Sequence, residues 1–470
     1  MMRLAEMNDV VRGRVLGEDL AIEGVSIDGR SMPANGLFVA LKGERVDGHD
    51  YIQQAVAQGA VAVMVEREVE SSVPLLLVDD ARSALAELAK HWRNQFTGKV
   101  IAITGSNGKT TVKEMVAAIM RQCGFTLATA GNLNNDLGVP LTLLRLDPKK
   151  HQFAVIEMGA NHVGEIAYLC KIANPDISLI NNVGAAHLEG FGSIDDVVIA
   201  KSEIYRGLKS DGVAIINADD ARKADFIAHA KPHRTVFFSV TQVGDVQGEY
   251  LGTSSDGKLE IKISSEAGVI NVELPLLGLH NVSNAVAASA VTLTAGASLE
   301  NIKQGLENVK PVPGRLNVKT GVNDSIIIDD TYNANPSSCA VALDALASFP
   351  GKKIFVLGDM GELGEDELAL HAEVGEQAYT KGIDEIFCLG DLSHAAAEAF
   401  PAERAFKHKR RENLVKDLLA KLAADDFVGA AILIKGSRFM QMERVVKEIT
   451  ERENKLGDSV STNVGAVTGE

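Results

Sequence analysis

The sequence predicts an α/β protein with three domains, and three observations support this prediction. The chain has 470 residues, a length that suits about three domains of roughly 150 residues each. Along most of it, short β-branched apolar runs alternate with apolar residues at helical spacing, which is typical of parallel sheets with crossover helices. Residues 310–316 contain two prolines and a glycine, and a second series of strand-like runs follows them.

From these observations we expect four segments. Residues 1–96 form a small α/β N-terminal domain, and residues 97–312 form a central P-loop-type domain around a doubly wound, mostly parallel sheet. Residues 313–452 form a C-terminal Rossmann-like domain. Residues 453–470 lack periodicity, so we expect a loosely ordered tail. Residues 235–277 include short alternating segments, which predict an antiparallel extension of the central sheet.

The composition excludes several classes of function. The 47 basic and 63 acidic residues leave a net charge of −16, which argues against a nucleic-acid binder because such a protein needs a basic surface. The four cysteines show no metal-ligand spacing, as expected in a reducing compartment. No run of about 18 apolar residues occurs, and the N-terminus has no apolar signal core. We therefore expect a soluble, cytoplasmic protein without membrane insertion.

The most informative motif opens the central domain. An apolar run at residues 100–103 leads into Thr-Gly-Ser-Asn-Gly-Lys-Thr-Thr, and apolar residues at helical spacing follow. A strand, a glycine loop, Lys-Thr and a helix form the layout of a nucleotide phosphate cradle, where backbone N–H groups face the anion. Its two glycines are three residues apart rather than five. The residues predicted to hold the nucleotide are Gly105, Ser106, Asn107, Gly108, Lys109, Thr110 and Thr111.

Two strand ends and one helix of the same domain add candidate residues. Glu157 and His187 each follow a predicted strand, so they could converge with Thr110 beside the phosphate loop. Thr110 and Glu157 offer the oxygen ligands that Mg²⁺ prefers. His187 alone is more often a polar loop residue, and Lys201, on a predicted helix, is alone more often a surface lysine. Together these residues make ATP hydrolysis or phosphoryl transfer plausible, with the acceptor unnamed.

Two polar clusters interrupt the N-terminal domain. They place charged side chains next to glycines at residues 28–31 and 42–49. Such clusters suit contacts to a phosphate or a sugar, and they equally suit solvated loops. The residues themselves leave both interpretations open.

The order of the motifs resembles that of the Mur ligase family, the ATP-dependent amide-forming enzymes of peptidoglycan synthesis. The resemblance extends from Asp28 to Arg438 and rests on GNLNNDLGVP at residues 131–140, DDTYNANP at 329–336 and VLGDMGELG at 356–364. These motifs are most similar to those of the member that adds D-Ala-D-Ala to UDP-N-acetylmuramoyl-tripeptide. The Asp-Asn-Pro-Arg signature of the diaminopimelate-adding member is absent.

The resemblance implies a reaction and its participants. ATP and Mg²⁺ would be the cofactors, the UDP-linked tripeptide and D-Ala-D-Ala the substrates, and an acyl phosphate the intermediate. We expect the chain to act as a monomer in the cytoplasm. The short glycine spacing of the phosphate loop is the form that this family uses.

For the reaction centre, the resemblance implies four catalytic residues. Lys109 would neutralise the β- and γ-phosphates, and Arg315 would reach them from the C-terminal domain. His187 would hold a second Mg²⁺, besides the one on Thr110 and Glu157. Lys201 matches the lysine that the family carbamylates, and as a carbamate it could also bind metal.

Around the rest of the substrates, the resemblance places His280 and Asn281 near the adenine and Asp330 and Tyr332 near the ribose and base. Lys435 and Arg438 would face the closed site. The UDP part would lie against Arg30, Ser31, Lys42, Asp47 and His49. The sequence departs from the family here, because Gly29 stands where a serine is more usual, so one hydrogen bond to the nucleotide could be missing.

Two other functions are compatible with parts of this pattern. Another Mur-type ligase or a folylpolyglutamate-synthetase-like ligase would share the ATP site and differ in its acceptor, although residues 42–49 favour a UDP-sugar substrate over folate. A P-loop nucleotide switch would need only one nucleotide domain. Two facing domains instead suit two substrates and domain closure.

Overall fold

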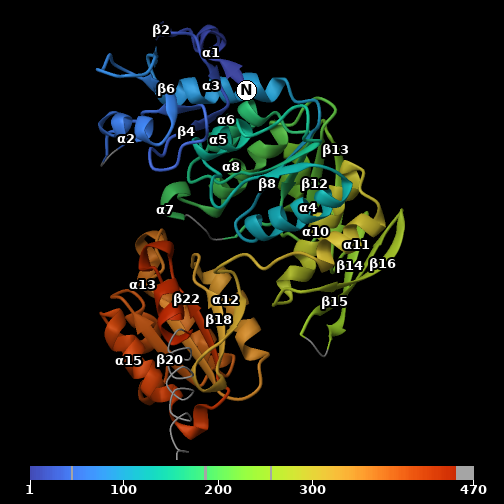
Figure 1. Ribbon diagram of the computed structural model, residues 1–470. Helices are drawn as coiled ribbons and strands as arrows, with labels where there is room; N and C mark the ends of the chain where they lie inside the picture. Colours follow the sequence, from blue (N-terminus) through green and yellow to red (C-terminus); the bar gives the residue numbers. More distant parts are fainter. Residues whose placement is uncertain (44–45, 185–187, 255–256, 451–470) are drawn as a thin grey trace, which may run out of the picture.

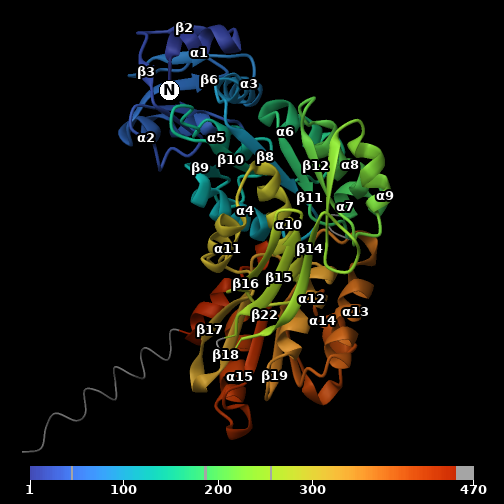
Figure 2. The ribbon, with the colours of Figure 1, turned by 90° about the vertical axis from the view of Figure 1, so that its right-hand side faces the viewer.

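The computed structural model describes residues 1–43, 46–184, 188–254 and 257–450. They form three α/β units arranged one after another, with the N-terminal unit at one end and the C-terminal unit at the other (Figure 1, Figure 2). The sheets are mostly parallel, so the predicted fold class is confirmed. The predicted tail at 453–470 and His187 lie outside the described residues. In the described part of the chain, no helix combines the length and apolar character needed to span a bilayer.

The N-terminal unit has a five-stranded sheet in the order β2-β7-β6-β5-β4. Its strands are β2 (Arg14–Leu16), β4 (Gly24–Ser26), β5 (Gly36–Val39), β6 (Ala60–Val65) and β7 (Leu75–Leu77). A separate pair consists of β1 (Met2–Arg3) and β3 (Ala21–Ile22). The helices are α1 (Leu4–Val11), α2 (Ile52–Ala57) and α3 (Ala81–Asn94).

Helix α3 joins the N-terminal and central units. Asp80 caps it by accepting a hydrogen bond from the Ser83 backbone N–H at 2.6 Å. Its buried face contacts α5 (Gly138–Leu143) and α6 (Glu165–Ala173) of the central unit. One apolar core, including Leu85 and Trp92, continues across this boundary. The two units are therefore held in a defined relative position by a shared apolar core.

The central unit has a nine-stranded sheet in the order β16-β15-β14-β13-β12-β11-β8-β10-β9. Its parallel strands are β8 (Lys99–Thr104), β9 (Thr126–Ala128), β10 (Phe153–Glu157), β11 (Ile177–Ile180), β12 (Val213–Asn217), β13 (Arg234–Ser239) and β14 (Val246–Thr253). Strands β15 (Leu259–Ser265) and β16 (Gly268–Leu274) run antiparallel beyond β14. The predicted antiparallel extension is confirmed.

Helices cover both faces of this sheet. Alternate residues of β8 point to opposite faces, so Val100 and Ala102 enter one core while Ile101 and Ile103 enter the other. The first core contains residues of α3, α5, α6, α8 (Ile194–Arg206) and α9 (Lys223–Ala230). The second contains residues of α4 (Lys109–Cys123), α10 (His280–Ala295) and α11 (Leu299–Glu307). The short helix α7 spans Leu188–Phe191.

The C-terminal unit has a six-stranded sheet in the order β17-β18-β22-β19-β20-β21. Its strands are β17 (Asn317–Thr320), β18 (Ile326–Asp330), β19 (Lys353–Gly358), β20 (Glu385–Leu389), β21 (Ala405–His408) and β22 (Ala431–Lys435). Its helices are α12 (Pro336–Ala347), α13 (Glu367–Thr380), α14 (His394–Glu398) and α15 (Arg411–Leu422), and residues 443–450 are also helical. Only β17 is antiparallel to its neighbour in this sheet.

Candidate active site

The phosphate loop lies at the C-terminal end of β8, next to the start of α4. Gly108 has a φ of +78°, and Lys109 begins the helix. A Cβ atom on Gly108 would lie 2.6 Å from Asn181 Nδ2 and 2.8 Å from Asn284 Oδ1. Glycine is therefore required at this position by both backbone conformation and space.

Asparagine side chains form a chain of hydrogen bonds beneath the loop. Asn181 Nδ2 donates to the Asn107 carbonyl at 3.1 Å and to Asn284 Oδ1 at 2.9 Å. Asn284 Nδ2 donates to Asn281 Oδ1 at 2.8 Å, and Asn281 Nδ2 donates to the Leu277 carbonyl at 2.8 Å. These bonds link the phosphate loop to the N-terminus of α10, so the two ends of the predicted nucleotide site share one rigid support.

Lys109 is folded back over the phosphate loop. Its Nζ donates to the Gly105 carbonyl at 2.6 Å and to the Ser106 carbonyl at 3.2 Å. The pKa of Lys109 is lowered to about 8, mainly by burial; the Glu157 carboxylate opposes this effect, and the Arg315 cation adds to it. A cation with so few partners is ready to interact with an anion placed above the loop.

Glu157 presents a free carboxylate oxygen beside the loop. It ends β10 and is 2% exposed. Its Oε1 accepts a hydrogen bond from Asn134 Nδ2 at 2.7 Å, whereas its buried Oε2 has no partner in the described structure. A buried, unpartnered carboxylate oxygen is a strong candidate ligand for a cation. Asn134, to which the sequence assigned no role, orients this carboxylate.

Lys201 is not a surface residue. It lies on α8 and is 1% exposed, with its Nζ 5.7 Å from the centre of the Phe191 ring. In the described part of the chain its ammonium donates no hydrogen bond. Burial, and then the nearby Lys109 cation, hold the pKa of Lys201 well below its ordinary range. An unpaired buried cation is unfavourable, so the environment favours the neutral form of this amine.

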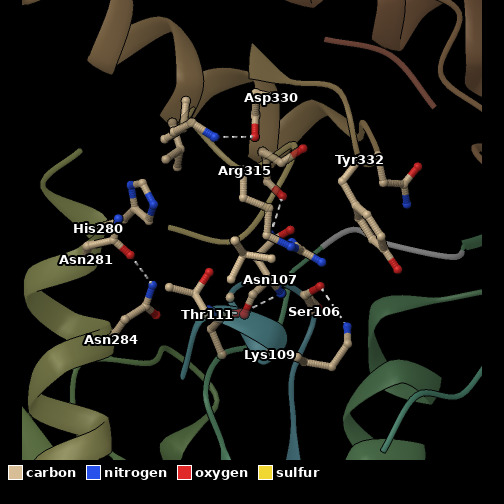
Figure 3. A pocket seen from close by; sticks show the side chains of 18 of the residues that line it. Ser106, Asn107, Lys109, Thr111, His280, Asn281, Asn284, Arg315, Asp330 and Tyr332 are labelled. Carbon is tan, nitrogen blue, oxygen red and sulfur yellow. Dashed lines mark hydrogen bonds between the residues drawn. The ribbon is translucent and has the colours of Figure 1, made fainter. Parts of the chain in front are cut away.

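Arg315 reaches the phosphate loop from the segment that leads to the C-terminal unit. Its Nη2 donates to Thr110 Oγ1 at 3.0 Å, and its guanidinium lies 4.3 Å from the centre of the Tyr332 ring. Figure 3 shows Arg315 and Tyr332 on the same side of the pocket, facing the loop that carries Lys109. Residues more than 200 positions apart in the chain thus meet at one point.

The N-terminus of α12 also contacts the phosphate loop. Asn107 Nδ2 donates to Ser337 Oγ at 2.9 Å, and Asn335 Nδ2 donates to Asn107 Oδ1 at 3.3 Å. Asn335 is the N-cap of α12, accepting from the Ser338 backbone N–H at 2.8 Å. Sequence reasoning gave Asn335 and Ser337 no role, although both lie in or beside the DDTYNANP motif.

A buried ion pair supports the loop after β18. Lys435 Nζ pairs with Asp330 Oδ2 and donates to the Asn333 carbonyl at 2.9 Å. Asp330 Oδ1 accepts from the Leu316 backbone N–H at 3.2 Å. His280, at the start of α10, lies near this ion pair. Its burial lowers its pKa to about 4, so the imidazole is neutral near pH 7. A neutral imidazole is suited to lie against an aromatic base.

Most of these groups line one cavity of about 560 Å³ between the central and C-terminal units, whereas Lys201 lines neither this cavity nor the one described next. Of the twelve residues predicted to bind the nucleotide, all except Gly105 and Thr110 line it: Ser106, Asn107, Gly108, Lys109, Thr111, His280, Asn281, Arg315, Asp330 and Tyr332. Glu157 and Lys435 also line it. The structure therefore brings the candidate nucleotide residues together.

A second cavity, here called the interdomain pocket, has a volume of about 630 Å³. It extends from the phosphate loop to the first turn of α3 in the N-terminal unit and is lined by Asp80, Arg82, Ser83, Lys109, Asn134, Asn135, Asp136, Gly159, Ala160, Asn161, Val163, Gly164, Glu165, Tyr168 and Leu169. Lys109 and Asn134 line both cavities. The two spaces therefore meet at the phosphate loop.

The five residues expected to contact the UDP part lie elsewhere in the N-terminal unit. Arg30 is exposed and pairs with Asp28 at 2.9 Å. Asp47 binds His49 Nδ1 at 2.6 Å and Arg67 at 3.2 Å. Neither cavity is lined by Arg30, Ser31, Lys42, Asp47 or His49.

Three family models match successive parts of this chain. The Mur ligase family, catalytic domain, matches residues 21–93, the Mur ligase middle domain matches 103–292, and the Mur ligase, glutamate ligase domain, matches 314–438. The UDP-N-acetylmuramoyl-tripeptide–D-alanyl-D-alanine ligase of Escherichia coli K12 is 44% identical over 449 residues, which cover 95% of this chain and 98% of that ligase. This chain belongs to the Mur ligase family.

Solved structures of Mur ligases share the fold. The UDP-N-acetylmuramoylalanyl-D-glutamyl-2,6-diaminopimelate–D-alanyl-D-alanyl ligase of Acinetobacter baumannii is 38% identical, with a TM-score of 0.84 over 95% of this chain and 98% of that one. The MurF ligase of Thermotoga maritima, solved in complex with ADP, is 32% identical, with a TM-score of 0.79 over 92% and 98% of the two chains. The expected family and fold are confirmed for this Mur ligase.

Proposed function

We propose that this Mur ligase joins D-Ala-D-Ala to UDP-N-acetylmuramoyl-tripeptide at the expense of ATP, as a cytoplasmic monomer in peptidoglycan precursor synthesis. The observation that carries the proposal is the meeting of two cavities at Lys109 and Asn134. One cavity collects the candidate nucleotide residues, and the other opens toward the N-terminal unit. The name of the 44%-identical relative describes a ligase of the same two substrates.

The three units divide the work in this proposal. Residues 1–96 take the UDP substrate, residues 97–312 take ATP, and residues 313–452 close over the nucleotide and receive the incoming dipeptide. In the N-terminal unit, the UDP part contacts Arg30, Ser31, Lys42, Asp47 and His49. The network of Asp47, His49 and Arg67 supports this assignment because it links polar side chains before α2 to one that follows β6.

The reaction proceeds in two steps. A terminal carboxylate oxygen of the tripeptide attacks the γ-phosphorus, ADP leaves, and an acyl phosphate forms. The amine of D-Ala-D-Ala then attacks the acyl carbon, loses a proton, and expels inorganic phosphate from the tetrahedral intermediate. Such chemistry depends on positioning and charge neutralisation rather than on a protein nucleophile. Lys109 and Arg315 supply positive charge from opposite sides of the cavity.

Mg²⁺ fits the donor groups beside the phosphate loop. Thr110 offers a hydroxyl, and the unpartnered Oε2 of Glu157 offers a carboxylate oxygen. His187 would hold a second ion, although it lies outside the described residues. Bound Mg²⁺ would neutralise phosphate charge during the transfer.

Carbamylation of Lys201 is consistent with its surroundings. Only a neutral amine reacts with carbon dioxide, and burial shifts the Lys201 amine toward its neutral form. The carbamate would carry negative charge, which the Lys109 cation and a metal ion would both favour. Lys201 would thereby become a metal ligand.

At the other end of the nucleotide, His280 and Asn281 contact the adenine, and Asp330 and Tyr332 contact the ribose and base. The neutral state of His280 supports stacking on an uncharged ring. The asparagine chain from Asn281 to the phosphate loop would hold both ends of ATP at a constant spacing.

The direct test is a phosphate-release assay with ATP and UDP-tripeptide. We expect release with D-Ala-D-Ala and little with single amino acids or glutamate. Release with glutamate and a folate substrate, or with a single amino acid but not the dipeptide, would instead identify another ligase of this family.

The pKa of Lys109 predicts a pH dependence. Because the free enzyme's ammonium loses its proton as the pH rises through about 8, kcat/KM for ATP should fall above this pH, by up to about tenfold per pH unit. The steady-state rate at low ATP concentration, followed from pH 6 to pH 10, measures this fall in kcat/KM. Since the Arg315 cation lowers the Lys109 pKa, Arg315→Gln should shift the fall in kcat/KM to higher pH. A fall at an unchanged pH in that variant would contradict the assignment to Lys109.

A further inference from the structure

The interdomain pocket contains an arginine that the proposed reaction does not yet use. Among the described residues that line the pocket, Lys109 and Arg82 are the two with cationic side chains. Lys109 is engaged with the phosphate loop and the nucleotide cavity. Arg82 remains as the cation available to whatever occupies the rest of the pocket.

Arg82 stands at an unusual place for its charge. It is in the first turn of α3, two residues after the N-cap Asp80, where the helix dipole disfavours a cation. Its side chain is 50% exposed, and its Nη1 pairs with Asp136, which is 35% exposed. In the described part of the chain its Nε and Nη2 donate no hydrogen bond. An exposed ion pair of this kind contributes little to stability, so the guanidinium is free to exchange partners.

The other charged groups of the pocket are already occupied within the protein. Asp80 accepts from the Ser83 backbone N–H at 2.6 Å, and Glu165 accepts from the Asn161 backbone N–H at 2.8 Å. Two apolar side chains on or next to α6 are exposed in this wall, with Val163 51% and Tyr168 37% exposed. The pocket therefore offers an apolar surface and one available guanidinium.

A peptide substrate carries the matching groups. A chain of alanine, glutamate and diaminopimelate, the peptide in the name of the Acinetobacter ligase, keeps one free glutamate carboxylate and one free diaminopimelate carboxylate besides the one that reacts. Its aliphatic stems suit the apolar wall. A substrate that reaches from the N-terminal unit to Lys109 would pass Arg82 on the way.

We propose that Arg82 binds a free, non-reacting carboxylate of the tripeptide and so positions the reacting carboxylate at the phosphate loop. The inference rests on the proposed function. Arg82 exchanges Asp136 for the substrate carboxylate, and its planar fork binds that group through two N–H donors. Arg82 is a substrate-binding residue and takes no part in the bond changes.

Steady-state kinetics of Arg82→Gln and the matched variant Asp136→Asn test this assignment. Arg82→Gln should raise KM for the UDP-tripeptide by about 10- to 100-fold, the range for a lost charge-assisted hydrogen bond. Its kcat and its KM for ATP and D-Ala-D-Ala should stay within about threefold. Asp136→Asn frees the guanidinium, so its KM for the tripeptide should be unchanged or lower. Equal increases in both variants would show that Arg82 serves only the ion pair, and would overturn the proposal.

Amidated substrates identify the carboxylate. Tripeptides amidated at the glutamate carboxylate or at the distal diaminopimelate carboxylate, and a tripeptide ending in lysine, are compared in the native enzyme and in Arg82→Gln. The increase in KM caused by Arg82→Gln should disappear with the substrate that lacks the carboxylate bound by Arg82. An increase in KM that persists with every one of these substrates would refute the contact between Arg82 and a substrate carboxylate. If the native enzyme releases no phosphate with any tripeptide and D-Ala-D-Ala, the proposed function fails instead.

Discussion

Replacing Lys109 with alanine is expected to lower the rate of phosphate release by at least about 10³-fold, equivalent to about 4 kcal/mol of transition-state stabilisation. The reason is that Lys109 lies where both cavities meet, so its charge acts on the phosphoryl group while that group is transferred. The UDP-tripeptide is held mainly by the N-terminal unit in our proposal, and its affinity should change by less than about threefold. Phosphate release and calorimetric binding of the tripeptide measure the two effects.

A surface lysine of the same segment serves as the control for Lys109. Lys99 begins β8 and is exposed, so Lys99→Ala should keep native turnover. Retained turnover in Lys109→Ala, or a tripeptide affinity that falls in parallel with turnover, would show that the lysine is not the group that neutralises the phosphates.

Replacing Lys201 with methionine should remove activity without weakening the fold. Methionine fills similar space and replaces an amine that has no hydrogen-bond partner in the described structure, so the unfolding temperature should stay the same or rise. Loss of the carbamate and its metal contact should lower turnover by about 10²- to 10³-fold. Thermal unfolding and phosphate release are measured on the same samples.

Carbamylation itself can be observed. Native protein equilibrated with ¹³C-labelled carbon dioxide should show one carbamate carbon resonance that is absent from Lys201→Met and present in Lys171→Ala, whose lysine is exposed on α6. Native turnover in Lys201→Met, or a resonance that survives this substitution, would rule out the carbamate on Lys201.

Most long elements of the fold could be predicted from the residue pattern. The apolar run expected at residues 100–103 lies within β8 (Lys99–Thr104), and the apolar residues at helical spacing after the phosphate loop lie in α4 (Lys109–Cys123), because each pattern is continuous along the chain. Short edge strands such as β2 (Arg14–Leu16) and β17 (Asn317–Thr320) were not predicted. They have three and four residues and half-exposed or exposed side chains, so their pairing depends on the neighbouring strand rather than on their own pattern.

The candidate site also contains some residues whose role could be predicted from the sequence and others whose role could not. The phosphate loop is continuous in the chain, so its glycine, lysine and threonine residues predict phosphate binding before the fold is known. Lys201 shows the opposite case, since alone it resembles a surface lysine, whereas the fold buries it and leaves its amine without a hydrogen-bond partner among the described residues. The resemblance to the family supplied its role, and the structure supplied a physical basis for it.

The order of residues thus suffices for the fold class, the phosphate loop and the family, because each rests on periodicity or on neighbours in the chain. Three features required the folded molecule: the contact of Arg315 with Thr110, the bridge between Asn107 and Ser337, and the free oxygen of Glu157. Each depends on distances between separate elements, and those distances are set by how the sheets and helices pack. The same holds for the pocket in which Arg82 meets the predicted path of the substrate.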